Sequence, residues 1–428
     1  MEKDRDAHNR EARPRVAVIG GGIAGISASV SLAQSGAVVD LVEKDFALGG
    51  HSYRFTCKAA EQCNKCSVCI VNERLRELTA NPLIKIHTGS SLTSAAQESG
   101  GSWKLGLSVA PRRVDTDLCI ACGLCEDVCP TEPKSITLPQ PEAVPLSFCV
   151  NEETCLFVKD QSCRECEPAC PTNAVRLKQT ASEETVEADA VVLATGFAPF
   201  DAAREPQYGY GRLPNVVTGI ELEESLRYSG EPVRPSDGKR AERIAFIQCV
   251  GSRERRTGNA YCSQVCCMYA SRLASTIKAN RPETDIMIFY MDLQTFGKGF
   301  TEFIERSSEH ITFVREMPGS VERDPSTGDL VIKVEDKAAN KVVEHAFDMV
   351  VLSVGITPAP DTTKLAEMLG VEIDVHGFFR TADPLNLAAT KNPRVFVAGA
   401  CQGPKDIADS IAQANSCAEK VMVVLGER

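Results

Sequence analysis

Residues 15–43 read RVAVIGGGIAGISASVSLAQSGAVVDLVE and give the clearest indication of the fold class. The runs RVAVI and VVDLV are short, apolar and rich in β-branched residues, so both predict buried strands. Between them, apolar residues recur at helical spacing from Ile23 to about Ser35, and Gly36 is a suitable helix stop. The stretch therefore predicts a strand–helix–strand unit of an α/β fold.

The junction between the first strand and the helix has the glycine spacing of a dinucleotide-binding turn. Gly20, Gly22 and Gly25 follow the pattern GxGxxG. The first glycine permits a tight turn, the second lets the backbone approach a pyrophosphate, and the third allows close helix–strand packing. Glu43 ends the second strand, where a carboxylate can bind the hydroxyls of a ribose. These residues predict a site for FAD or NAD at the helix N-terminus.

Further apolar runs extend this pattern along the chain. Strands are expected at 187–196, 243–248, 285–290, 348–355 and 394–399, with a paired region around 311–347. The run at 348–355 repeats the pattern of residues 189–196. Residues 112–177 show little periodicity but many Cys and Pro, which indicates a small inserted domain.

Composition narrows the function classes. The chain has 428 residues and a formal net charge of −11, which argues against a nucleic-acid-binding protein. No apolar run reaches the ~20 residues needed to span a bilayer. The charged N-terminus lacks a following apolar stretch, so it is not a secretory signal, and residues 1–13 are expected to be a disordered tail. The 19 cysteines fall in tight groups, which favours metal binding over a disulfide framework.

Two of these groups have ferredoxin spacing. The first run, C-x2-C-x2-C-x3-C-P, is Cys119, Cys122, Cys125, Cys129 and Pro130. The second run has a longer first gap and is Cys155, Cys163, Cys166, Cys170 and Pro171. In two-cluster ferredoxins the fourth Cys of a run binds the other cluster. We therefore expect one [4Fe–4S] cluster on Cys119, Cys122, Cys125 and Cys170, and a second on Cys155, Cys163, Cys166 and Cys129. Cys149 is an alternative to Cys155.

Two further groups are less specific by spacing alone. Cys57, Cys63, Cys66 and Cys69 provide four thiols in a short segment, enough for another cluster, although a structural zinc ion stays open as an alternative. Cys249, Cys262, Cys266 and Cys267 form the last group, in which two cysteines are adjacent. Inert buried thiols are the default interpretation of such a pattern. Cys401 and Cys417 belong to no group.

The chain resembles the flavoproteins that have two dinucleotide-binding domains, of which thioredoxin reductase is one. The resemblance rests on the GxGxxG turn, on Glu43 and Lys44 followed by Leu48, Gly49 and Gly50, and on the segments Ala194-Thr195-Gly196 and Ala398-Gly399. It implies FAD in the first domain, contacted by these segments. The family usually has Asp after the last Ala-Gly pair, whereas this chain has Ala400.

The second strand–turn unit begins at 243–248 but continues as QCVGSR, without GxGxxG. A nicotinamide site therefore looks lost there, because the backbone cannot approach a pyrophosphate without those glycines. QCVGSR followed by YCSQVCCMYA closely resembles the flavin- and cluster-carrying subunits of heterodisulfide reductases, in which these four cysteines hold a [4Fe–4S] cluster near the flavin. The family has Lys where this chain has Arg272, which the resemblance places near the flavin.

These resemblances imply an α/β, thioredoxin reductase-like flavoprotein with an inserted two-cluster ferredoxin domain. The expected parts are a tail (1–13), a first FAD-binding part (14–110) with a Cys-rich insertion (51–72), the ferredoxin domain (111–178), a second FAD-binding part (179–238), a degenerate NAD-binding-like domain (239–345) and a third FAD-binding part (346–428). The sequence shows no general acid–base constellation. His51 follows Gly50, and a packing role is favoured over a flavin contact.

The expected function is that of an electron-transfer subunit of a multi-subunit oxidoreductase resembling heterodisulfide reductase. It would carry FAD and up to four [4Fe–4S] clusters, and relay electrons to partner redox subunits. Flavin-based electron bifurcation is one use of the flavin in such a complex. The alternatives are the corresponding flavin-carrying subunit of a quinone-interacting membrane-bound oxidoreductase complex and a stand-alone NAD(P)H-dependent flavin reductase. A cytoplasmic location, with membrane association only through partner subunits, and a homodimer are compatible with this expectation.

Overall fold

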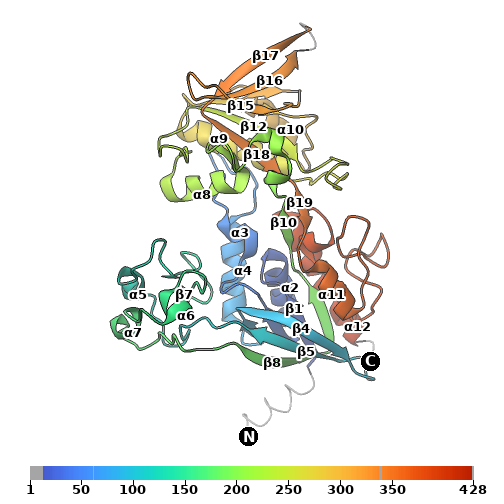
Figure 1. Ribbon diagram of the computed structural model, residues 1–428. Helices are drawn as coiled ribbons and strands as arrows, with labels where there is room; N and C mark the ends of the chain where they lie inside the picture. The colour runs from blue at the N-terminus through green and yellow to red at the C-terminus, as the bar shows by residue number, and fades with distance from the viewer. Residues whose placement is uncertain (1–12, 61, 337–339, 427–428) are drawn as a thin grey trace.

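A computed structural model describes residues 13–60, 62–336 and 340–426 of the chain. It contains two α/β units and a small Cys-rich part that projects beside the first unit (Figure 1). The expected disordered tail lies, except for Arg13, outside the described residues. The two-unit flavoprotein fold with an inserted ferredoxin-like part is therefore confirmed.

The first unit is built on a parallel five-stranded sheet, in the order β20-β9-β1-β2-β3. Its strands are β1 (Arg15–Ile19), β2 (Val38–Val42), β3 (Ile84–His87), β9 (Ala190–Leu193) and β20 (Val395–Val397). Its helices are α2 (Ile23–Gln34), α3 (Gly50–Arg54), α4 (Cys69–Ala80), α11 (Thr362–Leu369), α12 (Ile407–Gly426) and the short η3 (Gly399–Gln402). The strand–helix–strand unit expected from residues 15–43 is confirmed to within a residue at each end.

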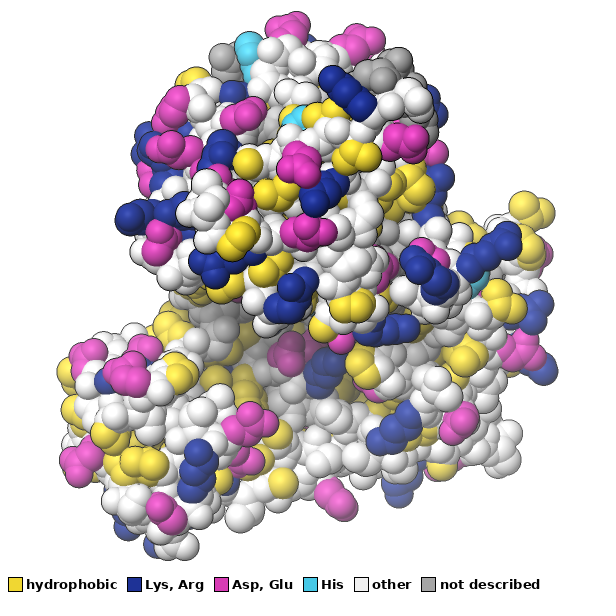
Figure 2. Space-filling view, turned by 45° about the horizontal axis from the view of Figure 1, so that its top comes forward, with side chains coloured by type: hydrophobic (Ala, Val, Ile, Leu, Met, Phe, Trp, Pro, Cys, Tyr) yellow, Lys and Arg dark blue, Asp and Glu magenta, His cyan; other side chains and the backbone are white. Residues whose placement is uncertain are grey.

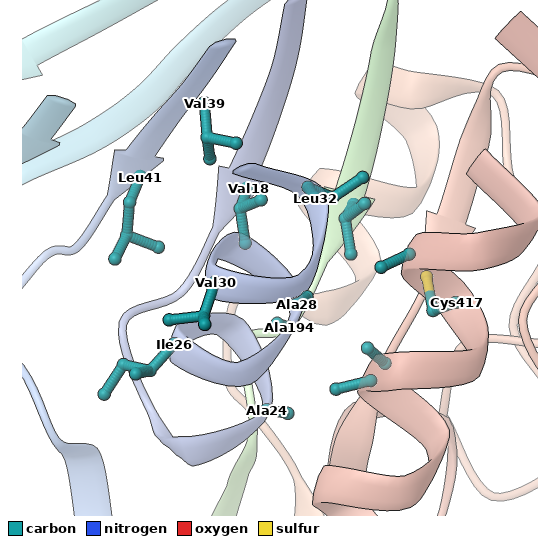
Figure 3. Close-up of a cluster of buried hydrophobic side chains, with 14 of the residues drawn as sticks. Val18, Ala24, Ile26, Ala28, Val30, Leu32, Val39, Leu41, Ala194 and Cys417 are labelled. Carbon is teal, nitrogen blue, oxygen red and sulfur yellow. The ribbon is translucent and has the colours of Figure 1, made fainter. Parts of the chain in front are cut away.

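Helix α2 is buried between the sheet and α12, because its apolar residues cover almost its whole surface. Ile26 and Leu32 are fully buried in this cluster, and Cys417 reaches it from α12 (Figure 3). Cys401 is likewise buried, in the core on the other side of the sheet. Both ungrouped cysteines are thus core residues of the first unit.

A three-stranded antiparallel sheet, β4-β5-β8, extends the first unit and carries the insert. Its strands are β4 (Ser90–Gln97), β5 (Trp103–Val109) and β8 (Ser182–Ala188). The insert leaves this sheet after β5 and returns at β8. It contains only short elements, which are α5 (Leu124–Asp127), β6 (Ile136–Thr137), β7 (Cys149–Val150), α6 (Leu156–Asp160) and α7 (Cys166–Ala169). The lack of periodicity in this part of the sequence reflects that absence of long elements.

The second unit repeats the architecture of the first. Its parallel sheet has the order β11-β18-β12-β13-β14, and an antiparallel sheet, β15-β16-β17, extends it. The strands are β11 (Val216–Thr218), β12 (Arg243–Val250), β13 (Asp285–Phe289), β14 (Thr312–Val314), β15 (Val321–Arg323), β16 (Leu330–Asp336), β17 (Lys341–Phe347) and β18 (Met349–Val354). The helices are α8 (Gly219–Ser229), α9 (Cys266–Asn280) and α10 (Phe300–Ser307). β18 occupies the position that β9 has in the first unit, as the repeated sequence pattern indicates.

The strand pairing divides the chain at different places from the expected boundaries. β11 and α8 were expected in a flavin-binding part, but β11 pairs with β18 in the second sheet. β18 was also expected in a flavin-binding part, and it pairs with β12. The units are joined by the antiparallel pair β10 (Phe197–Pro199) and β19 (Ile356–Pro358), near the single turns η1 (Ala202–Arg204) and η2 (Pro206–Tyr208). In the structure, the chain therefore passes between the two units at β10 and β19, and not at the expected boundaries 238/239 and 345/346.

Candidate functional site

A cleft of about 690 Å³ runs between the two units, starting from the glycine turn between β1 and α2. Figure 2 shows a shaded hollow beneath the upper lobe, which the second unit forms. Its walls include the N-terminus of α2, the segment that follows β9, and the residues before α12. The carboxyl ends of parallel strands meet at this edge, where open α/β sheets bind their ligands.

The three motif glycines have different structural roles. A Cβ built on Gly22 would meet no atom within 4 Å, and its φ of −75° is open to any residue. Gly20 has φ +112°, and a Cβ there would overlap the carbonyl of Ala194. A Cβ at Gly25 would overlap the carbonyl oxygen of Gly20. Gly20 and Gly25 therefore hold α2 close to the sheet, whereas Gly22 leaves free space on the cleft wall.

Glu43 fixes the same turn from the end of β2. Its side chain is buried, and its two carboxylate oxygens accept hydrogen bonds from Gly21 N at 2.6 Å and Asp45 N at 2.8 Å. Burial raises the pKa of Glu43 above its usual value despite these bonds. Each oxygen keeps a further lone pair, so the carboxylate can also accept a ribose hydroxyl. The open wall at Gly22 and this buried acceptor fit the pyrophosphate and ribose of FAD.

The structure brings most of the expected flavin-contacting residues to one cleft. Those on its wall are Gly20, Gly22, Glu43, Lys44, Gly50, Ala194, Thr195, Gly196, Arg272 and Ala400. Gly25, Gly49 and Gly399 are not on the wall. Gly49 has φ +117° and donates to Gly21 O, and Gly399 has φ +79° and lies against Ala24. These three glycines support the cleft through backbone packing.

Two further side chains, those of His51 and Lys405, also line the cleft. His51 lines it and stacks on Phe197, with 4.5 Å between ring centroids, so the expected packing role and the flavin-facing position occur together. Burial lowers the pKa of His51. Lys405 lies beside Ala400 and donates to the carbonyls of Gly399 and Gly403. The spacing of residues in the sequence does not predict contacts of this kind.

The turn that follows β12 differs from the glycine turn of the first unit. Residues 20–22 separate β1 from α2, whereas residues 251–265 separate β12 from α9. Cys249 lies at the end of this strand, and Cys266 and Cys267 begin the helix. The turn position of a dinucleotide-binding unit is thus occupied by thiols in the second unit.

The four thiols of this group lie close together. Complete burial raises the pKa of Cys266 well above its usual value, and the thiols of Cys249, Cys267 and Cys262 raise it further. Burial and then Cys267 raise the pKa of Cys249 to about 11. Such thiols ionise when they bind metal, which releases protons. Their convergence favours the cluster-binding interpretation over inert buried thiols.

The insert brings its two cysteine runs together in one small core. Burial raises the pKa of Cys166 to about 12, and the next contributions come from Cys155, then Cys163 and Cys129. Cys149 instead has the Arg112 guanidinium as its charged neighbour. This arrangement supports the set Cys155, Cys163, Cys166 and Cys129, with Cys155 rather than Cys149.

The other expected set is Cys119, Cys122, Cys125 and Cys170. Burial raises the pKa of Cys125 to about 12, and the nearby thiols of Cys119 and Cys166 also raise it. Cys119 and Cys125 therefore lie together, and the two sets are neighbours through Cys166. Backbone N–H groups of Ser135 and Ala174 point at the sulfurs of Cys129 and Cys170, at 3.4 and 3.2 Å. Such hydrogen bonds favour thiolate ligands and tune the potential of a cluster.

The segment with Cys63, Cys66 and Cys69 repeats the backbone of the first ferredoxin run. Lys65 has φ +51° and Ser67 has φ +62°, on either side of Cys66. The residues on either side of Cys122, at positions 121 and 123, have φ +54° and +87°. Left-handed conformations are uncommon outside glycine, so two at matching positions indicate the same type of turn. This match supports a cluster on the segment.

Among the residues that the structure describes, no group of three or more His, Cys, Asp or Glu side chains is arranged around a single metal ion. A structural zinc site needs four ligands within about 2.3 Å of one ion. A [4Fe–4S] cluster binds its four thiolates at different irons, so the sulfurs surround a larger body.

Three family models match the chain. The pyridine nucleotide-disulphide oxidoreductase model matches residues 150–419, and an FAD dependent oxidoreductase model matches residues 15–91. A 4Fe-4S binding domain model matches residues 112–134, in the insert. FAD and [4Fe–4S] clusters are thus the cofactors of this chain.

Curated relatives match nearly the whole chain. Two of them are iron–sulfur subunits of CoB--CoM heterodisulfide reductase, both of the type designated A. The chain is 36% identical, over 96% of its length, to the one from Methanocaldococcus jannaschii. It is 40% identical, again over 96%, to the second of the two from Methanopyrus kandleri. In both cases the chain spans 64% of the relative's length.

Solved structures support the fold. Thioredoxin reductase from T. acidophilum matches with a TM-score of 0.53 and 14% identity, covering 95% of this chain and 97% of that one. The Lactococcus lactis thioredoxin reductase has the same score, with 15% identity and coverage of 97% and 100%. The chain belongs to the pyridine nucleotide-disulphide oxidoreductase family, as an oxidoreductase that resembles the A-type iron–sulfur subunits of heterodisulfide reductase over 96% of its length.

Proposed function

We propose that the chain is an electron-transfer subunit of a multi-subunit oxidoreductase of the heterodisulfide reductase type. A bound FAD exchanges electrons in pairs, and [4Fe–4S] clusters exchange them singly. The relatives are named as subunits of a larger enzyme, which supports partner subunits that supply or accept the electrons. A cytoplasmic location is part of the proposal, because cluster thiols need a reducing compartment.

The observation that carries the proposal is the position of two cysteines on the flavin cleft. Cys66, from the first unit, and Cys266, from the second, both line it. Each belongs to a separate group of four thiols. The cleft wall that a nicotinamide would approach therefore carries cluster ligands. We infer that the clusters of these two groups are the redox neighbours of the flavin.

The chain's own residues prepare this site in three ways. Gly22 and Glu43 fit the adenosine diphosphate end of FAD. The half-buried Lys405 adds positive charge beside Ala400, where the related flavoproteins have an aspartate. Cys249, Cys266 and Cys267 are buried, whereas Cys262 is half-buried, and burial strengthens electrostatic effects at the three buried thiols.

A stand-alone NAD(P)H-dependent reductase is the second candidate. It would need a pyrophosphate-binding turn in the second unit, and residues 251–265 lack that turn. The test is anaerobic mixing of the isolated chain with NADH or NADPH. We expect the flavin to stay oxidised for seconds, whereas rapid bleaching would overturn the proposal in favour of the reductase.

Membership of a quinone-interacting membrane-bound complex is a closely related alternative. Among the described residues, no helix is long and apolar enough to cross a membrane. Under this alternative, contact with the membrane would come from partner subunits. Co-purification of the native complex distinguishes the two, since its partners define the acceptor. The subunit stoichiometry of the purified complex tests whether the chain is a homodimer. Coupled reduction of a high-potential and a low-potential acceptor by that complex tests whether its flavin bifurcates electrons.

A further inference from the structure

Arg272 makes contacts that differ from those of a simple flavin neighbour. It lies on α9, six residues after Cys266, and its side chain is 8% exposed. Its Nε donates to the carbonyl oxygen of Asn64 at 2.9 Å, and its Nη2 donates to that of Lys65 at 3.0 Å. The guanidinium thus binds two successive carbonyls of the Cys63–Cys66 turn.

This turn has a backbone that needs such support. Lys65 and Ser67 are left-handed without being glycine, a conformation that costs energy and persists only when surrounding contacts impose it. The planar fork of arginine matches two acceptors at once, and lysine cannot reproduce that geometry. The guanidinium also packs over the Phe300 ring, 5.1 Å from its centroid. Phe300 of α10 therefore fixes the position of the Arg272 guanidinium, and the guanidinium fixes the cysteine turn.

The charge of Arg272 is close to the thiols of the turn. Burial lowers the pKa of Arg272, and Cys66 is the first of the opposing charges that favour its cationic form, followed by Asp406 and Cys63. A buried cation acts strongly on a nearby redox group because screening by water is weak. Reduction makes a cluster more negative, so a fixed cation favours the reduced state.

We propose that Arg272 is a positioning residue for the redox centre of Cys57, Cys63, Cys66 and Cys69. It ties the Cys63–Cys66 turn to the helix that begins with Cys266 and Cys267, and it raises the reduction potential of the cluster held by the turn. The inference rests on the proposed function, because it requires a cluster on this segment. One side chain thereby connects the two cysteine groups that line the flavin cleft.

The experiment compares Arg272→Gln, Arg272→Lys and Cys66→Ala in anaerobically prepared full-length chain. Iron analysis and EPR-monitored redox titration are the two readouts. The spectrum that Cys66→Ala removes identifies the cluster of this segment. In Arg272→Gln we expect that cluster to titrate at a more negative potential, or to lose its iron alone. In Arg272→Lys we expect a potential nearer to that of the wild type, with an altered EPR line shape.

Arg281→Gln is the matched control. Arg281 directly follows α9, but its guanidinium pairs with Glu231, lies outside the flavin cleft and is not tied to the cysteine turn. We expect it to leave the cluster potential unchanged. A wild-type potential and line shape in Arg272→Gln would overturn the inference while leaving the proposed function intact. Unchanged iron in Cys66→Ala would overturn the inference and the assignment of a cluster to this segment, and the proposed function would then rest on the other three cysteine groups.

Discussion

At the scale of single residues, one motif serves two purposes. Gly20 and Gly25 allow close approach of backbone to backbone, and only Gly22 faces open space on the cleft wall. The GxGxxG motif already predicted different roles for the three glycines, with backbone approach at Gly22 and close packing at Gly25. The distinction depends on which atoms face each missing Cβ, and that is set by how α2 packs.

The difference between the glycines gives a prediction. Gly22→Val should fold, because the added Cβ meets no atom within 4 Å, and it should lose FAD, because the side chain occupies the space for the pyrophosphate. Flavin occupancy after purification and the far-UV circular dichroism spectrum check both parts. Gly319→Val is the control, since a Cβ there also meets nothing. Full flavin occupancy in Gly22→Val would show that the FAD site is assigned wrongly.

Glu43 gives a pH prediction. Because burial raises its pKa, it takes up a proton at a higher pH than an exposed glutamate as the solution is acidified. Protonation removes part of its capacity to accept hydrogen bonds, so FAD affinity should fall as pH decreases through that range. Glu43→Gln should weaken FAD binding by about 10- to 100-fold, from the ~1.5–3 kcal/mol of a charged hydrogen bond, and should flatten this pH dependence. Fluorescence titration of released flavin measures both, and an equal pH dependence in the variant would contradict the role.

At the scale of elements, the segment 57–69 is attached to the second unit although it follows α3 of the first. Lys58 and Glu223 form an ion pair between this segment and α8, with side chains 2% and 0% exposed. Thr56 also donates to Glu223, through its N and its Oγ1. Sequence patterns predicted the cysteines of the segment but not this attachment, because residues 165 positions apart leave no spacing signal.

The ion pair gives a prediction about this attachment. Lys58→Met should lower the free energy of unfolding by about 3–5 kcal/mol, because it leaves a buried carboxylate unpaired. The double variant Lys58→Met/Glu223→Leu should recover most of this loss, since neither charge remains. Denaturant unfolding monitored by tryptophan and circular dichroism measures the difference. Lys333→Met, which removes an exposed pair with Glu322, is the control and should change stability little. If Lys58→Met is as stable as Lys333→Met, the buried ion pair does not anchor the segment.

The sequence did not predict which of the two sheets each short strand joins. The strand periodicity predicted β12, β13 and β18 but no strand at β11, and the expected domain boundaries put the residues of β11 and β18 in the flavin-binding unit, whereas both pair within the second sheet. Short buried strands look alike in sequence, and only hydrogen bonding between strands decides which sheet receives them. The ferredoxin insert was predicted well because its spacing is itself the ligand pattern.

At the scale of the whole molecule, two similar units have different turns after their first strand. The first retains glycines for a dinucleotide, and the second has cysteines in the same place. Cys66 and Cys266 bring two thiol groups to the cleft between the units. We therefore propose that a cluster replaces a nicotinamide as the redox neighbour of the flavin in this molecule.

Iron and FAD analysis of anaerobically prepared chain tests this claim most directly. Sixteen of the 19 cysteines form four groups, so we predict about 16 irons per FAD, at four per cluster. Cys266→Ala should lose about four of them and keep its FAD, while Cys417→Ala, which changes a core thiol, should lose none. About eight irons would leave only the ferredoxin insert with clusters. Unchanged iron in Cys266→Ala would contradict the proposal that a cluster is the redox neighbour of the flavin, because no cluster would then occupy the nicotinamide position.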